Sequence, residues 1–222
     1  MQLLKRNKVF DYSFLAAGLL IQVVTYVLSP QLPLISLISG LLGVCSVVLT
    51  AQGNIWFYLF GFGQVITYTY LCFTQRFYAE IAINGYYFVT MIYGVFVWKS
   101  RVKSQESKVI TPRQLTWQML TLTAVLTLLG SWLVGWGLAL WTDDTQPYLD
   151  AFTTVPALVA QVLMIMVYRE HWFLWLAVDI FSVAMWLRAG DYCMTAQYAF
   201  WCANCLYGLR RWQMLTRQTT DA

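Results

Sequence analysis

Charged residues are scarce in this chain. Only 11% of its 222 residues are charged and histidine occurs once, whereas a soluble globular domain carries about twice that charged fraction. Hydrophobic residues make up 59%, and the mean hydropathy is +0.59. Apolar runs of about 20 residues recur between short polar gaps, and each is long enough to cross a bilayer as a helix. The composition excludes an ordinary soluble domain and predicts an all-α, polytopic membrane protein.

The shortage of ligating and nucleophilic residues excludes several kinds of chemistry. His171 is distant in sequence from the C-x-x-C pair of Cys202 and Cys205, so a zinc site lacks ligands and buried thiols are expected. No phosphate-binding G-x-x-x-x-G-K-[ST] and no G-x-S-x-G occurs. Every lysine lies outside the apolar runs, which excludes a retinal Schiff base. We therefore expect no cofactor and no catalytic residues, although an intramembrane enzyme and a scaffold without substrate stay as rival classes.

The apolar pattern predicts eight transmembrane helices joined by short loops. They cover Phe10–Leu28, Pro33–Ala51, Ile55–Phe73, Ala79–Trp98, Leu115–Trp141, Leu149–Tyr168, Trp172–Ala189 and Tyr192–Leu209. The prediction divides the chain into an N-terminal helix (1–32), a first three-helix bundle (33–98), a cytoplasmic loop with a linker helix (99–147), a second three-helix bundle (148–212) and a cytoplasmic tail (213–222).

Basic residues fall on one side of this arrangement. Eight spans place on that side Lys5, Arg6, Lys8, Arg101, Lys103, Lys108, Arg113, Arg169, Arg210, Arg211 and Arg217. The other side receives Asp143, Asp144, Asp150 and Asp191, with Arg76 and Arg188 as its basic residues. Because cytoplasmic loops are rich in lysine and arginine, both termini are predicted to be cytoplasmic. The net charge of +4 therefore reflects membrane topology and does not indicate nucleic acid.

Two segments of the chain resemble each other. Tyr93-Gly94 and Trp98 close the fourth predicted span as Tyr207-Gly208 and Trp212 close the eighth, both as Y-G-x-x-x-W. The segment from Trp56 to Leu59 is matched loosely with the segment from Trp172 to Trp175. Spans two to four then correspond to spans six to eight, with the fifth as a linker. Repeats of this kind are typical of transporters, whose substrate site lies near the midplane where the halves meet.

Polar and aromatic residues at membrane depth are the candidates for a substrate site, because polar groups in lipid usually face a cavity or each other. They are Gln64, Asn84, Tyr87, Trp172, Trp175, Asp179, Gln197, Trp201 and Asn204. Asp179 is the one carboxylate well inside a predicted span. Gln22 and Gln161 stand alone and are predicted to make interhelical hydrogen bonds. Trp98, Trp117, Trp141 and Trp212 end predicted spans and are expected in the interfacial aromatic belts.

These residues carry a family resemblance. Glu170 and the W-x-x-W of Trp172 and Trp175, followed by Asp179, resemble the E-x-W-x-x-W segment of the PnuC-type vitamin transporters; Y-G-x-x-x-W at the last helix and Asn84 ahead of Tyr93-Gly94 also resemble that family. The resemblance covers about Pro33 to Trp212. It implies a three-plus-one-plus-three helical core related to SWEET sugar transporters, with one extra N-terminal helix. It also implies a homotrimer that takes up nicotinamide riboside across the bacterial inner membrane.

The residues are compatible with that substrate, which is a pyridinium cation bearing a carboxamide and a ribose. We expect Trp172, Trp175 and Trp201 to supply aromatic surfaces, Asn84, Gln197, Asn204 and Gln64 to supply hydrogen bonds, Tyr87 to do either, and Asp179 to balance charge or orient its neighbours. Facilitated diffusion is the simplest mechanism, and the resemblance implies trapping by cytoplasmic phosphorylation. Thiamine or riboflavin is the alternative cargo, because members of the family carry different vitamins.

Overall fold

The computed structural model describes residues 8–29, 31–76, 78–103, 110–143, 146–190 and 192–220. Within them lie eight α-helices: α1 (Lys8–Leu28), α2 (Leu34–Ala51), α3 (Phe57–Gln75), α4 (Tyr78–Lys103), α5 (Trp117–Trp141), α6 (Pro147–Ile165), α7 (His171–Ala189) and α8 (Tyr192–Thr220). The predicted all-α fold with eight long helices is confirmed. Five of these helices, α1, α2, α4, α5 and α6, are long and apolar enough to cross a membrane.

The helix ends differ most from the prediction on one side of the bundle. Helix α4 continues to Lys103 and α8 to Thr220, well beyond the expected ends at Trp98 and Leu209. Polar residues that leave the apolar layer can still continue a helix, so hydropathy marks the layer and not the helix end. Of the basic and acidic residues used to orient the chain, Lys5, Arg6, Lys108, Asp144 and Asp191 lie outside the described residues.

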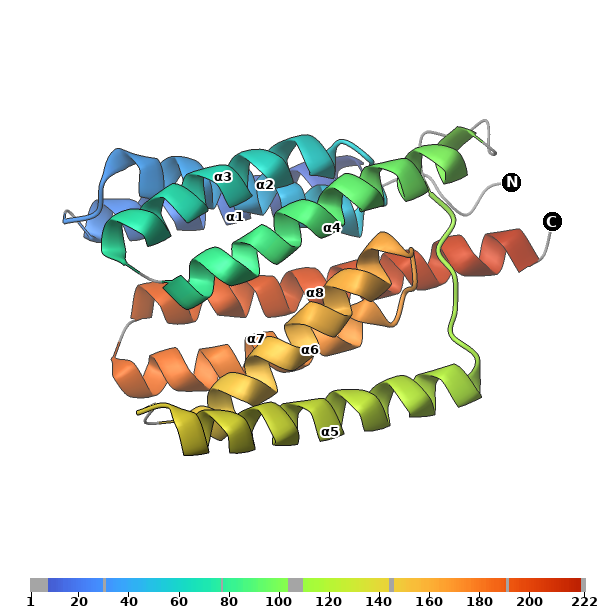
Figure 1. Cartoon of the computed structure of the whole chain (residues 1–222). Coiled ribbons are helices and arrows are strands. Elements are labelled where there is room, and N and C mark those ends of the chain that lie inside the picture. The colour runs from blue at the N-terminus through green and yellow to red at the C-terminus, as the bar shows by residue number, and fades with distance from the viewer. Residues whose placement is uncertain are drawn as a thin grey trace.

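The helices form one bundle in which chain neighbours pack side by side, except α4 and α5 (Figure 1). Helix α3 packs against α2 and α4, and α7 packs against α6 and α8. The two groups meet where α2 packs against α8 and α4 against α6. Helix α1 contacts both α2 and α8, whereas the described part of α5 packs only against α6, at an edge of the bundle. Helix α1 begins and α8 ends at the same end of the bundle, as an even number of spans requires.

The turns after α2 and α6 have the same backbone structure. Gly53 N donates to Thr50 O at 2.9 Å, and Val167 N donates to Met164 O at 3.0 Å. Gly53 and Val167 both adopt positive φ angles, of 68° and 65°. A β-branched residue rarely adopts this conformation, so Val167 is held there by its surroundings: it is fully buried and its carbonyl accepts from Arg113 N at 2.7 Å.

These turns correct the register of the internal resemblance. They pair Phe57 with His171 and Tyr58 with Trp172, because each pair begins a helix with the same hydrogen-bond pattern. The loose match of Trp56 with Trp172 was therefore wrong by two residues. The same offset relates Gly94 to Gly208 and Trp98 to Trp212, as the Y-G-x-x-x-W motif predicted. The backbone of the turns gives the correct alignment of the two halves. The similar dipeptides Trp56-Phe57 and Trp172-Phe173 give an alignment that is two residues off.

The chain between α4 and α5 runs along both turns. Ile110 N donates to Gly53 O at 3.3 Å, and Arg169 N donates to Arg113 O at 3.0 Å. Leu115 N donates to the carboxylate of Glu170 at 3.1 Å, and that carboxylate also pairs with Arg169 at 3.2 Å. This extended segment joins the two turns at the end of the bundle where α8 ends (Figure 1).

Candidate functional site

One stripe of residues on α4 faces the interior of the bundle. Its members recur at alternating spacings of four and three, which keeps them on one helix face. They are Glu80, Asn84, Tyr87, Met91, Gly94 and Trp98, and the last three together with Asn84 are buried. The equivalent stripe on α8 is Met194, Tyr198, Trp201, Cys205, Gly208 and Trp212, again buried over its last three members. Both stripes are thus most tightly packed toward the turns.

The two stripes meet at their tryptophans. The ring centroids of Trp98 and Trp212 are 6.0 Å apart, and both side chains are fully buried. Trp98 Nε1 donates to Met164 O at 3.4 Å, and Trp212 Nε1 donates to Thr50 O at 3.1 Å. Thr50 and Met164 are equivalent positions in the two turns, so each half of the repeat donates an indole N–H to the other. We call this end, from the two turns to Trp98 and Trp212, the closed end.

The interfacial prediction for these two tryptophans was therefore wrong. Trp98 and Trp212 are core residues whose indoles have partners inside the protein. Trp117 and Trp141 are instead 76% and 82% exposed at the two ends of α5, which is where an aromatic belt places them.

Trp172 also belongs to the closed end. It is 3% exposed, packs edge-on against Trp212 at 5.9 Å and lies 4.4 Å from the ring of His171. A Cβ atom on Gly208 would collide with the Trp172 indole, as one on Gly94 would collide with the Tyr58 hydroxyl. The glycines of the Y-G-x-x-x-W motifs thus allow α8 and α4 to approach the large rings that begin α7 and α3.

The middle of the bundle brings several predicted residues together. Tyr87 of α4 contacts Trp175 of α7 with ring centroids 6.5 Å apart, and both are half-buried. Asp179 lies one turn beyond Trp175, is 4% exposed and accepts a hydrogen bond from the Cys205 thiol at 3.4 Å. By the repeat offset, α3 carries Gly61 and Val65 where α7 carries Trp175 and Asp179. Of these two equivalent helices, only α7 thus carries an aromatic and an acidic group at this level.

Two further candidates lie beside this level. Asn204 donates from Nδ2 to Val47 O of α2 at 3.3 Å, and its Oδ1 is buried with no hydrogen-bond partner among the described residues. The half-buried Trp201 also has an indole N–H without a partner there, and its ring contacts that of Tyr198 at 4.9 Å. Unpaired buried polar groups are costly, which makes them candidates for ligand contacts.

The remaining candidates are less central. Asn84 is buried and donates to its own helix, at Glu80 O. Gln64 and Gln197 are half-buried and lie off the inner stripes; Gln64 is beside Gly43 of α2. Of the two isolated glutamines, Gln161 donates to Thr90 of α4 at 3.3 Å, so the predicted interhelical hydrogen bond is confirmed there.

Sequence reasoning missed two carboxylates in the bundle. Asp11 in the first turn of α1 is 3% exposed, accepts from Tyr207 at 2.6 Å and pairs with Arg211 at 3.1 Å. Glu80 in the first turn of α4 is half-buried on the inner stripe. Both lie near predicted span ends, where an acid is ordinarily expected to be solvated. The spacing of four and then three residues from Glu80 to Asn84 and Tyr87 does, however, indicate that the three share one helix face.

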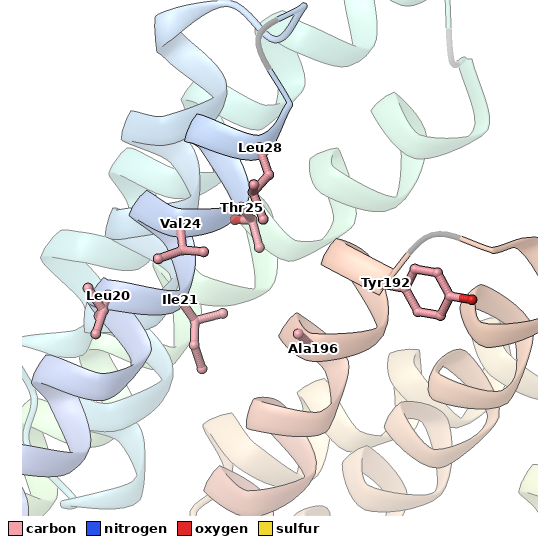
Figure 2. A pocket seen from close by; sticks show the side chains of 7 residues that line it. All are labelled: Leu20, Ile21, Val24, Thr25, Leu28, Tyr192 and Ala196. Atoms are coloured by element: carbon pink, nitrogen blue, oxygen red, sulfur yellow. The ribbon is translucent and has the colours of Figure 1, made fainter.

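An apolar pocket of about 270 Å³ lies between α1 and the first turns of α8 (Figure 2). Its lining includes Leu20, Val24 and Leu28, and the Tyr192 hydroxyl points away from α1. Such a surface offers no hydrogen bonds for a polar small molecule. The polar and aromatic groups in the middle of the bundle are therefore the better candidate site.

The eight packed helices have apolar outer faces, and their inner stripes carry polar and aromatic groups at membrane depth. These features define a polytopic membrane protein of the transporter class. The chain belongs to the nicotinamide mononucleotide transporter family, which matches residues 33–214.

Individual relatives agree with that assignment. The chain is 30% identical over 214 residues to the nicotinamide riboside transporter PnuC of Haemophilus influenzae, covering 96% of this chain and 93% of that protein. It is 30% identical over 224 residues to the protein of that name from Neisseria mucosa, covering 94% and 82%. A crystal structure of the vitamin B3 transporter PnuC superimposes with a TM-score of 0.79 at 28% identity, over 94% of this chain and 92% of that one. The chain is a multi-pass membrane transporter and not an enzyme.

Proposed function

We propose that this protein takes up nicotinamide riboside across the bacterial inner membrane by facilitated diffusion with alternating access. The relatives named as nicotinamide riboside transporters support this cargo. The observation that carries the proposal is the contact of Tyr87 and Trp175 across the two halves, one turn from Asp179. A flat pyridinium ring fits between two aromatic faces, and its positive charge is complementary to a nearby carboxylate.

The proposed binding site assigns different residues to the pyridinium ring, its charge, and the amide and ribose hydroxyls of the substrate. Trp175, Tyr87 and Trp201 would hold the ring, and Asp179 would balance its charge. Asn204, whose Oδ1 has no described partner, is the first candidate for the amide or ribose hydroxyls. Asn84, Gln64 and Gln197 are further candidates. We assign Trp172 to closure of the site, because it packs against Gly208 and Trp212.

We propose a three-plus-one-plus-three core like that of SWEET transporters, formed by α2–α4, α5 and α6–α8, with α1 as the extra helix. The matching turns and the reciprocal tryptophan hydrogen bonds support a two-fold relation between the outer groups. The bias of basic residues supports cytoplasmic termini, which places the closed end on the cytoplasmic side. Release inside then requires the closed end to open, and phosphorylation of the riboside would trap it in the cell. A homotrimer is proposed from the family resemblance alone.

Uptake by the purified protein tests the proposal. Proteoliposomes containing only this chain should accumulate labelled nicotinamide riboside down its gradient, without ATP and without a proton or sodium gradient. Excess unlabelled riboside should compete, and thiamine and riboflavin should not. Empty liposomes are the control. Absence of uptake by folded protein, or preferential competition by thiamine or riboflavin, would contradict the proposed cargo.

A further inference from the structure

We propose that Glu80 is a specificity-determining residue at the outer mouth of the transport path, where its carboxylate favours cationic over neutral ribosides. The inference rests on the proposed function and extends it to a residue outside the central site. Glu80 occupies the first position of the inner stripe of α4, four residues before Asn84 and seven before Tyr87. Residues at these spacings share one helix face, so Glu80 continues the face on which Tyr87 contacts Trp175.

The surroundings of Glu80 come from three helices. It lies within electrostatic range of Tyr68 and Cys72 near the end of α3, of Tyr87 on its own helix and of Tyr198 on α8. Helix α4 begins and α3 ends at the end of the bundle opposite the closed end, where α8 also begins, and the proposed orientation places this end outside (Figure 1). A half-buried carboxylate within electrostatic range of three tyrosines suits an organic cation better than a hydrated metal ion.

A second carboxylate, Asp179, lies further inward. Tyr198 interacts electrostatically with both Glu80 and Asp179, so both acids lie within electrostatic range of one ring. The other two carboxylates described inside the bundle, Asp11 and Glu170, each form an ion pair with an arginine. Among the described residues, no lysine or arginine forms an ion pair with Glu80 or Asp179. The path from the outer mouth to Trp175 therefore carries two carboxylates without an ion-paired base among the described residues, and a cationic substrate is complementary to their ionised forms.

The repeat indicates that the acids Glu80 and Asp179 are not needed for the packing of the helices. Met194 of α8 occupies the position equivalent to Glu80, and Val65 of α3 the position equivalent to Asp179. One half of the repeat thus packs without an acid at each level. Burying a carboxylate in a half-apolar site costs free energy, which indicates that Glu80 has a function there.

Kinetics in proteoliposomes tests the inference. Glu80→Gln keeps the shape of the side chain and removes its charge. We expect about a tenfold rise in KM for nicotinamide riboside with little change in maximal rate. Inhibition by the reduced riboside, a neutral dihydropyridine of nearly the same shape, should be unchanged. The wild-type KM should rise with ionic strength, and the variant's should rise less, because the variant lacks the part of the charged attraction that Glu80 supplies and that screening weakens. Glu80→Asp should retain most of the wild-type behaviour.

Asp143→Asn is the matched control, since Asp143 is an exposed acid near the same end of the bundle. It should leave the KM for nicotinamide riboside and the inhibition by the reduced riboside unchanged. Equal KM in wild type and Glu80→Gln, an equal loss for the charged and neutral ribosides, or a wild-type KM independent of ionic strength would overturn the role of Glu80. These results leave the proposed function intact as long as the wild type takes up riboside. Failure of the wild type to take it up would overturn the proposed function, and the inference with it.

Discussion

Trp212 donates its indole N–H to the backbone carbonyl of Thr50 across the two halves of the repeat, at 3.1 Å. The equivalent bond runs the other way, from Trp98 to Met164. The two buried tryptophans therefore stabilise the closed end in two ways, by packing against each other and by hydrogen-bonding the opposite half. The same bonds must break or move if the halves separate at this end, which makes them candidates for the contacts that alternating access disrupts.

Replacing Trp212 by phenylalanine removes the hydrogen bond and part of the ring. The Thr50 carbonyl keeps its bond from Gly53 N but loses its indole donor, and the smaller ring leaves a gap, so we expect a loss of about 1–3 kcal/mol in the free energy of unfolding. Thermal unfolding in detergent would show this as a lower Tm. Trp117→Phe is the control, because Trp117 is exposed on α5. Equal Tm values for both variants would show that the indole bond does not stabilise the closed end.

Gly208→Ala tests the close approach of α8 to Trp172. The new methyl group would collide with the indole, which is itself packed against Trp212 and His171. Overpacking of this kind costs about 1–3 kcal/mol. Gly85→Ala is matched to it, because Gly85 is also helical and a methyl group there meets nothing within 4 Å. We expect Gly208→Ala to lower Tm and Gly85→Ala to leave it unchanged or higher; the reverse order would contradict the packing described.

Asp11→Asn tests whether α1 is fastened to α8. Removing the charge leaves the Arg211 guanidinium, whose side chain is 15% exposed, without its anionic partner. Loss of one member of a largely buried pair costs about 1–3 kcal/mol for a group with this much solvent contact. Limited proteolysis or Tm should show a less stable protein, and Tyr207→Phe should have a smaller effect. A Tm equal to that of Asp143→Asn would show that the ion pair does not fasten α1.

The sequence predicted the helices well and their inner faces poorly. Eight apolar runs and the two Y-G-x-x-x-W motifs were readable because each signal is local and strong. The burial of Trp98 and Trp212 was not, since a tryptophan at a span end suits both an interface and a core when lipid and protein are equally apolar. The register of the repeat depended on the turns at Gly53 and Val167, whose shared backbone conformation is carried by two unlike residues.

Sequence also ranked the candidate site incompletely. It placed Trp172 with Trp175 among the residues of the substrate site, but a glycine on α8 brings Trp172 into the closed end. It selected Tyr87, Trp175 and Asp179, which the structure brings close together or onto adjacent turns. Glu80 was missed because its position in the first turn of a span suggested a solvated acid. The surroundings of Glu80 come from side chains of α3, α4 and α8, and one sequence does not show that they lie near one another.

Calorimetric titration of nicotinamide riboside into wild type and Trp175→Ala is the most direct test of the central claim that a ring-binding site lies between the two halves. We predict saturable binding to the wild type and a loss of about 1–3 kcal/mol, roughly 5- to 150-fold in Kd, in the variant. Trp117→Ala, with an unchanged Kd, would control for loss of a tryptophan. Wild-type affinity in a folded Trp175→Ala protein would contradict the claim.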